Sequence, residues 1–157
     1  MAKTEDPFRA VDDEARAQAR ALITEARYGA LAVLEPGSGS PSVSRVGLVP
    51  GPDGVPMTLV SDLSPHTQAM RAHPEVSLLL GEAPGKGDPL AYPRITLQCR
   101  AGFVDKAPLA EHFLELYPKA RLYFDFADFH LVRLNPHMAL LNGGYGKAYK
   151  LTRKDII

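Results

Sequence analysis

Short apolar segments, each ended within a few residues by glycine, proline or charge, run through most of this 157-residue chain. Few helical patterns separate them, which favours a closed antiparallel barrel over a parallel sheet with regular crossovers. We therefore predict a mainly β fold with peripheral α-helices, in a single domain spanning 1–157. The expected strands are ALAVLE (30–35), SVSRVGLV (42–49), MTLVSD (57–62), VSLLLGE (76–82), RITLQCRAGFV (94–104) and the closing segment 129–149.

Three helices are expected around these strands. Apolar residues recur at helical spacing over 12–27, with Asp12 or Asp13 as the N-cap. Ser64 and Pro65 begin a helix of about two turns that Pro74 ends. A third helix follows Asp105.

Turn chemistry sets the expected connections between strands. The stretch PGPDGVP (50–56) is dense in turn formers, so we expect the strands on either side of it to pair as an antiparallel hairpin. Asn135-Pro136 and 142–144 are expected turns or bulges. The final LTRKDII (151–157) is expected to be a polar tail.

Charge and cysteine content narrow the function classes. Lys plus Arg and Asp plus Glu both number 18, so bulk charge gives no reason to expect a nucleic-acid partner. The single cysteine forms no internal disulfide, and the N-terminus has acidic residues where a signal peptide needs an apolar run. No apolar stretch approaches the roughly 20 residues of a membrane span. We expect a cytoplasmic protein.

Two familiar site types are not supported by the sequence. GEAPGKGD (81–88) has three residues between its first two glycines where a phosphate-binding P-loop needs four, and Gly87 stands where that motif needs Ser or Thr. The five histidines form no HExxH and have no partner cysteines, so no metal site is expected. Cys99 is expected to be a small buried core residue.

A phosphate site is indicated where two strands and a helix start come together in the sequence. Arg45 supplies a planar fork of donors, and the helix start at 65–67 supplies backbone amides with a favourable dipole. Hydroxyl donors suit a phosphate better than a metal. The hydroxyl residues of this set are Ser44, Ser61, Ser64 and Thr67.

The stretch 41–80 resembles the FMN-binding split barrels of the pyridoxamine-phosphate oxidase-like superfamily, and the nearest branch is similar to the haem-utilisation group. The matching motifs are Ser61, His66-Thr67, Ser77-Leu78-Leu79 and the segment 143–148, GGYGKA. The resemblance implies an antiparallel split β-barrel that forms a homodimer, with FMN at the subunit interface.

This resemblance also implies site residues. The flavin phosphate is expected at Ser44, Arg45, Ser61, His66 and Thr67, and Ser64 joins this set as one of the hydroxyl residues named above. The ring is expected near Val46, Val60, Gln98, Tyr145 and Lys147.

The function expected on this basis is FMN-dependent oxidation or reduction of a small-molecule substrate, with no side chain assigned as catalytic acid or base. The alternatives are a haem-binding or haem-utilisation protein and a flavin-binding module without catalysis; a deazaflavin could replace FMN. Longer haem-utilisation members continue past the position of Ile157 into a further domain that contributes to haem binding. We therefore expect haem binding to be weaker than flavin binding. The basic substrate-binding residues of true pyridoxamine-phosphate oxidases are not found near the C-terminus, where only Arg153 and Lys154 stand.

Overall fold

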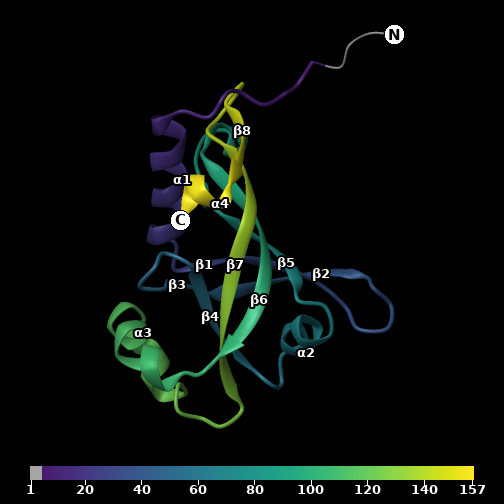
Figure 1. The fold of residues 1–157 in the computed structure, drawn as a ribbon, viewed down its shortest axis with the longest axis vertical. Coiled ribbons are helices and arrows are strands. Elements are labelled where there is room, and N and C mark those ends of the chain that lie inside the picture. The colour runs from purple at the N-terminus through teal and green to yellow at the C-terminus, as the bar shows by residue number, and fades with distance from the viewer. Residues whose placement is uncertain (1–4) are drawn as a thin grey trace.

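A single curled sheet dominates the computed structural model, which describes residues 5–157 (Figure 1). The strand order is β2-β1-β5-β6-β7-β4-β3, with β8 paired to β7, and every pairing is antiparallel. The strands are β1 (Tyr28–Leu34), β2 (Pro41–Gly47), β3 (Val49–Pro50), β4 (Pro56–Ser61), β5 (Glu75–Leu80), β6 (Arg94–Val104), β7 (Phe129–Asn142) and β8 (Ala148–Thr152). Residues 1–4, the start of the predicted domain and of the segment considered for a signal peptide, lie outside the described residues.

The helices lie at the periphery, as the sequence predicts (Figure 1). Asp12 caps α1, because its carboxylate accepts the amide of Ala15 at 2.8 Å. Helix α2 begins at Pro65 and ends before Pro74, although the Ser64 side chain makes no capping hydrogen bond. The helices are α1 (Asp13–Glu25), α2 (Pro65–Ala72), α3 (Ala110–Leu116) and α4 (Arg153–Ile156), with 3₁₀ turns η1 (Pro89–Ala91), η2 (Ala107–Leu109) and η3 (Pro118–Leu122).

The sheet curls so that its two ends approach each other without closing. Strands β2 and β4 come into contact, yet no ladder joins them within residues 5–157. Strand β4 pairs with β7 along one edge, and with β3 along the other only at Met57 and Pro56. The predicted antiparallel split barrel is therefore confirmed, and the split lies between β2 and β4.

The hydrophobic core has two parts. The larger fills the barrel and continues beneath α1, with Leu31, Leu78 and Leu97 fully buried. The smaller lies under α3 and η3, where Phe113 and Phe124 pack at 5.5 Å between ring centroids. Helix α3 lies at the lower end of the molecule in Figure 1, so this aromatic cluster adds a second layer to the barrel there.

The predicted hairpin across residues 50–56 is wrong in its main part. Strand β2 pairs along its whole length with β1, from Tyr28↔Gly47 to Leu34↔Pro41. The expected strand 42–49 is broken after Gly47, and the turn closes only the two-residue ladder of β3 with β4. The turn forms where its residues predict it, but its ladder ends after two pairs, and the extended partner of β2 is β1, on the opposite edge of β2.

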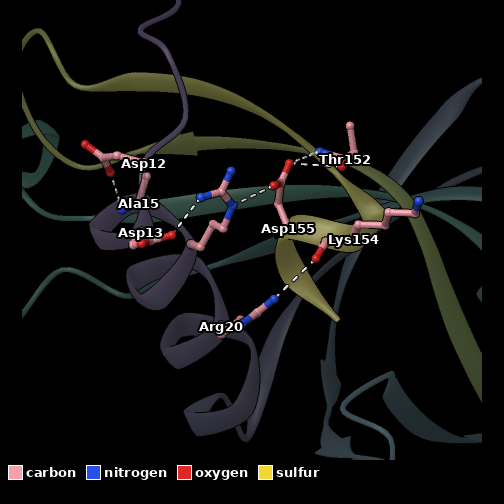
Figure 2. Close-up of polar contacts among 8 residues, drawn as sticks. Asp12, Asp13, Ala15, Arg20, Thr152, Lys154 and Asp155 are labelled. Atoms are coloured by element: carbon pink, nitrogen blue, oxygen red, sulfur yellow. Dashed lines mark hydrogen bonds and ion pairs between the residues drawn. The ribbon is translucent and has the colours of Figure 1, made fainter.

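The C-terminal segment is not the polar tail that its charged residues suggest. Leu151 is buried in β8 and Ile156 is buried in α4. The Asp155 carboxylate accepts a hydrogen bond from the Thr152 amide, and the Thr152 side chain accepts one from the Asp155 amide, so the two form a capping box. The same carboxylate also accepts from the Thr152 hydroxyl and, at 2.9 Å, from Arg16 Nε of α1 (Figure 2). These contacts tie the two ends of the described chain together.

No helix within residues 5–157 is both long and apolar enough to cross a membrane.

The capping carboxylate of Asp155 should contribute measurably to stability. Its pKa is lowered by the Thr152 amide and then by Arg16, so its contribution is present above the ordinary pKa of aspartate and is lost as the pH falls. We expect Asp155→Ala to lower the free energy of unfolding by about 1 kcal/mol at neutral pH. Urea unfolding measures this.

The matched control is Asp13→Ala, which removes a fully exposed carboxylate that also pairs with Arg16. An equal loss from both variants would show that the charge near Arg16 matters and that the cap does not.

Candidate functional site

A hollow of about 270 Å³ lies over the split in the barrel. One side is the edge of β2 and the other is β4, while the start of α2 and the segment between η3 and β7 close its ends. None of its lining residues is Asp or Glu. The lining residues are Arg45, Val46, Gly47, Leu59, Val60, Ser61, Ser64, His66, Tyr123 and Phe129.

Six residues predicted from the sequence meet in this hollow: Arg45, Val46, Val60, Ser61, Ser64 and His66. Ser44 stands directly behind them, since its Oγ is 3.0 Å from Nδ1 of His66. They come together because β2 and β4 face each other across the split and the loop after β4 leads directly into α2.

Thr67 lies behind the hollow and does not line it. Its side chain is fully buried, and its hydroxyl donates to the Ser61 carbonyl at 2.6 Å. The helix start also offers fewer donors than expected: Pro65 has no N–H, and the Thr67 amide donates to the Ser64 carbonyl. In the first turn this leaves the amide of His66 as the donor available to a ligand.

The other three predicted residues lie elsewhere. Gln98 lines a separate hollow of about 310 Å³ beside His137. The Tyr145 hydroxyl hydrogen-bonds to the Asp88 carboxylate, and Lys147 lines a hollow beside α1. Within this one chain, none of the three approaches the split.

Four lining residues were not predicted: Gly47, Leu59, Tyr123 and Phe129. Tyr123 and Phe129 follow α3 in the chain, far from the phosphate-type motif, and they reach the hollow because β7 pairs with β4. The register places Phe129 opposite Ser61. No motif near Tyr123 or Phe129 in the sequence indicates that they lie beside the phosphate-type residues.

Arg45 carries the charge of the site. Within residues 5–157 its guanidinium forms no hydrogen bond and no ion pair; it lies over the Tyr28 ring, 5.5 Å from the centroid. An exposed guanidinium without a counter-charge can accept an anionic ligand at little cost. The site is therefore suited to an anion.

His66 adds a neutral group. Partial burial lowers the pKa of its imidazole, so the ring is uncharged at neutral pH. Ser44 bonds to Nδ1, which orients the ring. The site thus combines one cation, several hydroxyls and a neutral imidazole.

A larger hollow of about 420 Å³ lies next to the first, and Arg45 lines both. It contains two glutamates, Glu25 and Glu82, and the Arg27 guanidinium there donates to the backbone at the end of α1. It has no hydroxyl cluster and no histidine, so the hollow over the split is the better candidate for an anionic ligand.

The described part of the chain offers neither a cluster of metal-binding side chains nor a reactive thiol. No group of three or more His, Cys, Asp or Glu side chains that could hold a metal occurs there. Burial raises the pKa of Cys99 to about 12, so this thiol remains protonated.

Comparison with known proteins gives a consistent picture. The family model described as pyridoxamine 5'-phosphate oxidase matches residues 15–141. The chain is 35% identical over 114 residues to the chloroplastic "non-canonical heme oxygenase HOZ" of Arabidopsis thaliana, which covers 71% of this chain and 34% of that protein. It therefore spans about a third of that relative's length.

Two further proteins are similar to most of this chain. The "heme oxygenase HutZ" of Vibrio cholerae is 27% identical over 129 residues, which is 76% of this chain and 71% of that protein. A solved structure of a heme binding protein from Mycobacterium smegmatis is 28% identical with a TM-score of 0.81, over 93% of this chain and 61% of that one.

The placement of Thr67 leads to a prediction that separates support from contact. Thr67→Val keeps the shape of the side chain but leaves the Ser61 carbonyl without its hydroxyl partner, so we expect it to lower the free energy of unfolding by about 1 kcal/mol. Chemical denaturation measures this. Unchanged stability with lost ligand binding would instead make Thr67 a ligand contact.

Proposed function

The chain belongs to the pyridoxamine 5'-phosphate oxidase family, and we propose that it is a haem-handling protein that binds its ligand in the hollow between β2 and β4. One observation carries the proposal: the hollow presents the cation of Arg45, which has no ion-pair partner within residues 5–157, and the neutral imidazole of His66 in an otherwise uncharged lining. Haem has acidic side groups on a flat apolar ring with iron at its centre. Arg45 suits the acidic groups, His66 suits the iron, and apolar lining residues such as Val60 suit the ring.

The named relatives support haem as the first candidate. Two relatives are named heme oxygenases and a third is named a heme binding protein. The family resemblance read from the sequence favours FMN first and haem second, and the names of these relatives favour the reverse order.

His66 is the candidate iron ligand. A neutral imidazole is the form of histidine that binds metals. If Nε2 bound iron, the ring proton would be on Nδ1, which would donate to Ser44 Oγ, the kind of outer-shell contact that orients such ligands. Three other histidines are engaged elsewhere: His112 bonds to the Pro50 carbonyl, and His130 and His137 lie 2.9 Å from Asp62 and 3.2 Å from Glu75.

FMN is the second candidate, and a specific observation favours it. The hydroxyls of Ser44, Ser61 and Ser64 gather beside Arg45, a donor set that suits a phosphate. The unpaired edges of β2 and β4 would offer backbone groups to the polar edge of a flavin ring or of a deazaflavin. With FMN bound, the protein would be an oxidoreductase acting on a small molecule, and the flavin would supply the redox chemistry.

A second copy of the chain is the proposed partner. The hollow, at about 270 Å³, falls below the roughly 300–1,000 Å³ of typical ligand pockets, so another surface should complete it. The outer sheet face offers that surface, because uncharged residues run across five strands in register: Val43, Ala32, Ser77, Gln98 and Met138.

This face is also exposed. Val43 is 67% accessible and Leu79, in the neighbouring row, is 45% accessible. An exposed and partly apolar face is typical of an isologous two-fold interface. It contains Gln98, the predicted ring contact that lies away from the split in one chain.

The role of Arg45 is tested by ligands with and without their acidic group. We expect Arg45→Ala to weaken the binding of haemin or FMN about tenfold or more, because a charge-assisted hydrogen bond is worth roughly 1.5–3 kcal/mol. The same variant should leave haem dimethyl ester and riboflavin, which lack the charge, almost unaffected. Absorbance titration measures both.

Arg20→Ala on α1 is the matched control, since it removes an arginine whose guanidinium lies away from the hollow. Equal losses for charged and uncharged ligands would refute the anion role of Arg45. Failure of the wild-type protein to bind either haemin or FMN saturably, at one per subunit, would refute the proposed function.

The second copy is tested by a charge placed on the sheet face. We expect light scattering to report a dimer for the wild-type protein and a monomer for Ser77→Arg, because a buried unpaired charge strongly disfavours an interface. Gln68→Arg, at an exposed position of α2, should remain a dimer. A wild-type monomer that binds its ligand at full affinity would contradict this proposal.

A further inference from the structure

The hollow over the split has an aromatic side that an anion site does not require. Tyr123 and Phe129 both line it, with ring centroids 4.9 Å apart and planes inclined by 36°. Both rings are only partly buried, so aromatic surface remains open to the same space as Arg45 and His66. We call these two rings the aromatic wall.

The aromatic wall is held in place from behind. The Tyr123 amide donates to the Ala120 carbonyl at 3.0 Å, and the Phe129 amide donates to the Phe126 carbonyl at 3.1 Å. Between them, Lys106 Nζ donates to the carbonyls of Phe124 and Phe126 at 2.7 and 2.9 Å. Lys106 thus fixes the backbone between Tyr123 and Phe129, so a ligand that binds here has little conformational entropy of these rings to remove.

The wall also stays uncharged. Burial raises the pKa of the Tyr123 phenol, and no carboxylate lines the hollow. A neutral aromatic surface in a fixed position favours a flat ring lying against it, because offset or tilted contacts between rings add to the area that they bury.

We propose that the aromatic wall of Tyr123 and Phe129 is the ring-selecting part of the site: it stacks against the planar ring of the ligand while Arg45 takes the anionic group. The inference rests on the proposed function and adds to it the residues that distinguish a planar aromatic anion from a simple anion. It holds for a porphyrin and for a flavin, since both are flat.

The test replaces each ring by an apolar side chain without one. We expect Tyr123→Leu and Phe129→Leu each to weaken the binding of haemin or FMN about fivefold or more. A loss of this size is typical when a ring that stacks against a ligand is removed. Inorganic phosphate, whose binding is followed by the shift in Tm, should be unaffected. Phe8→Leu changes an exposed phenylalanine of the N-terminal segment, so it should bind as the wild-type protein does.

A second readout is the fluorescence of FMN, and its first arm uses the wild-type protein alone. A flavin stacked on tyrosine loses fluorescence by electron transfer, so FMN should be quenched on binding, and Tyr123→Leu should restore its emission. FMN that binds with full emission would overturn the wall.

The outcomes separate the two proposals. Haemin or FMN binding that is unchanged in both leucine variants overturns the aromatic wall and leaves the proposed function standing. Equal weakening of phosphate and ring ligands also overturns the wall, because it would reflect damage to the whole hollow. A wild-type protein that binds neither haemin nor FMN overturns the proposed function and the wall with it.

Discussion

Strand β7 hydrogen-bonds to three other strands, and the rest of the fold depends on that arrangement. Along one edge it pairs with β6, from Arg94↔Asn142 to Val104↔Leu131. Its other edge serves β4 at its beginning and β8 at its end. Between these two partners the ladder slips by one residue, since Gln98 pairs with Met138 but Cys99 pairs with Pro136. Proline cannot donate to a ladder, and the resulting bulge divides the barrel from the β7–β8 hairpin.

The candidate site follows from where this sheet fails to close. A curled sheet with unpaired ends leaves backbone groups and side chains of both edges facing one space, and here β2 supplies Arg45 while β4 supplies Ser61. The aromatic layer under α3 packs against the same edge. Gly47 leaves room for this approach, because a Cβ at that position would lie in tight contact, 3.2 Å from the Tyr117 hydroxyl. The hollow therefore exists because two edges stay apart and a third layer comes close.

The site was predictable from the sequence only in its contiguous part. Arg45, Ser61 and His66 belong to one stretch of chain whose hydroxyls, cation and helix start indicate an anion site by residue type alone. Thr67 belongs to the same stretch, yet its hydroxyl turns to the Ser61 carbonyl, and a residue's type does not say which way its side chain points. Tyr123 and Phe129 come from beyond α3, where nothing nearby in the sequence marks them as site residues.

What the sequence by itself determined is local: the bounds of β6, the cap of α1 by Asp12, the start of α2 at Pro65, and the mainly β class. These follow from side-chain periodicity and turn chemistry, which act over a few residues. Only the tertiary structure decided the partner of β2, the burial of Ile156 in α4, and the meeting of Arg45 with Tyr123. Each of these depends on which of several similar strand edges and apolar faces pair, and that choice is made by the packing of the whole sheet.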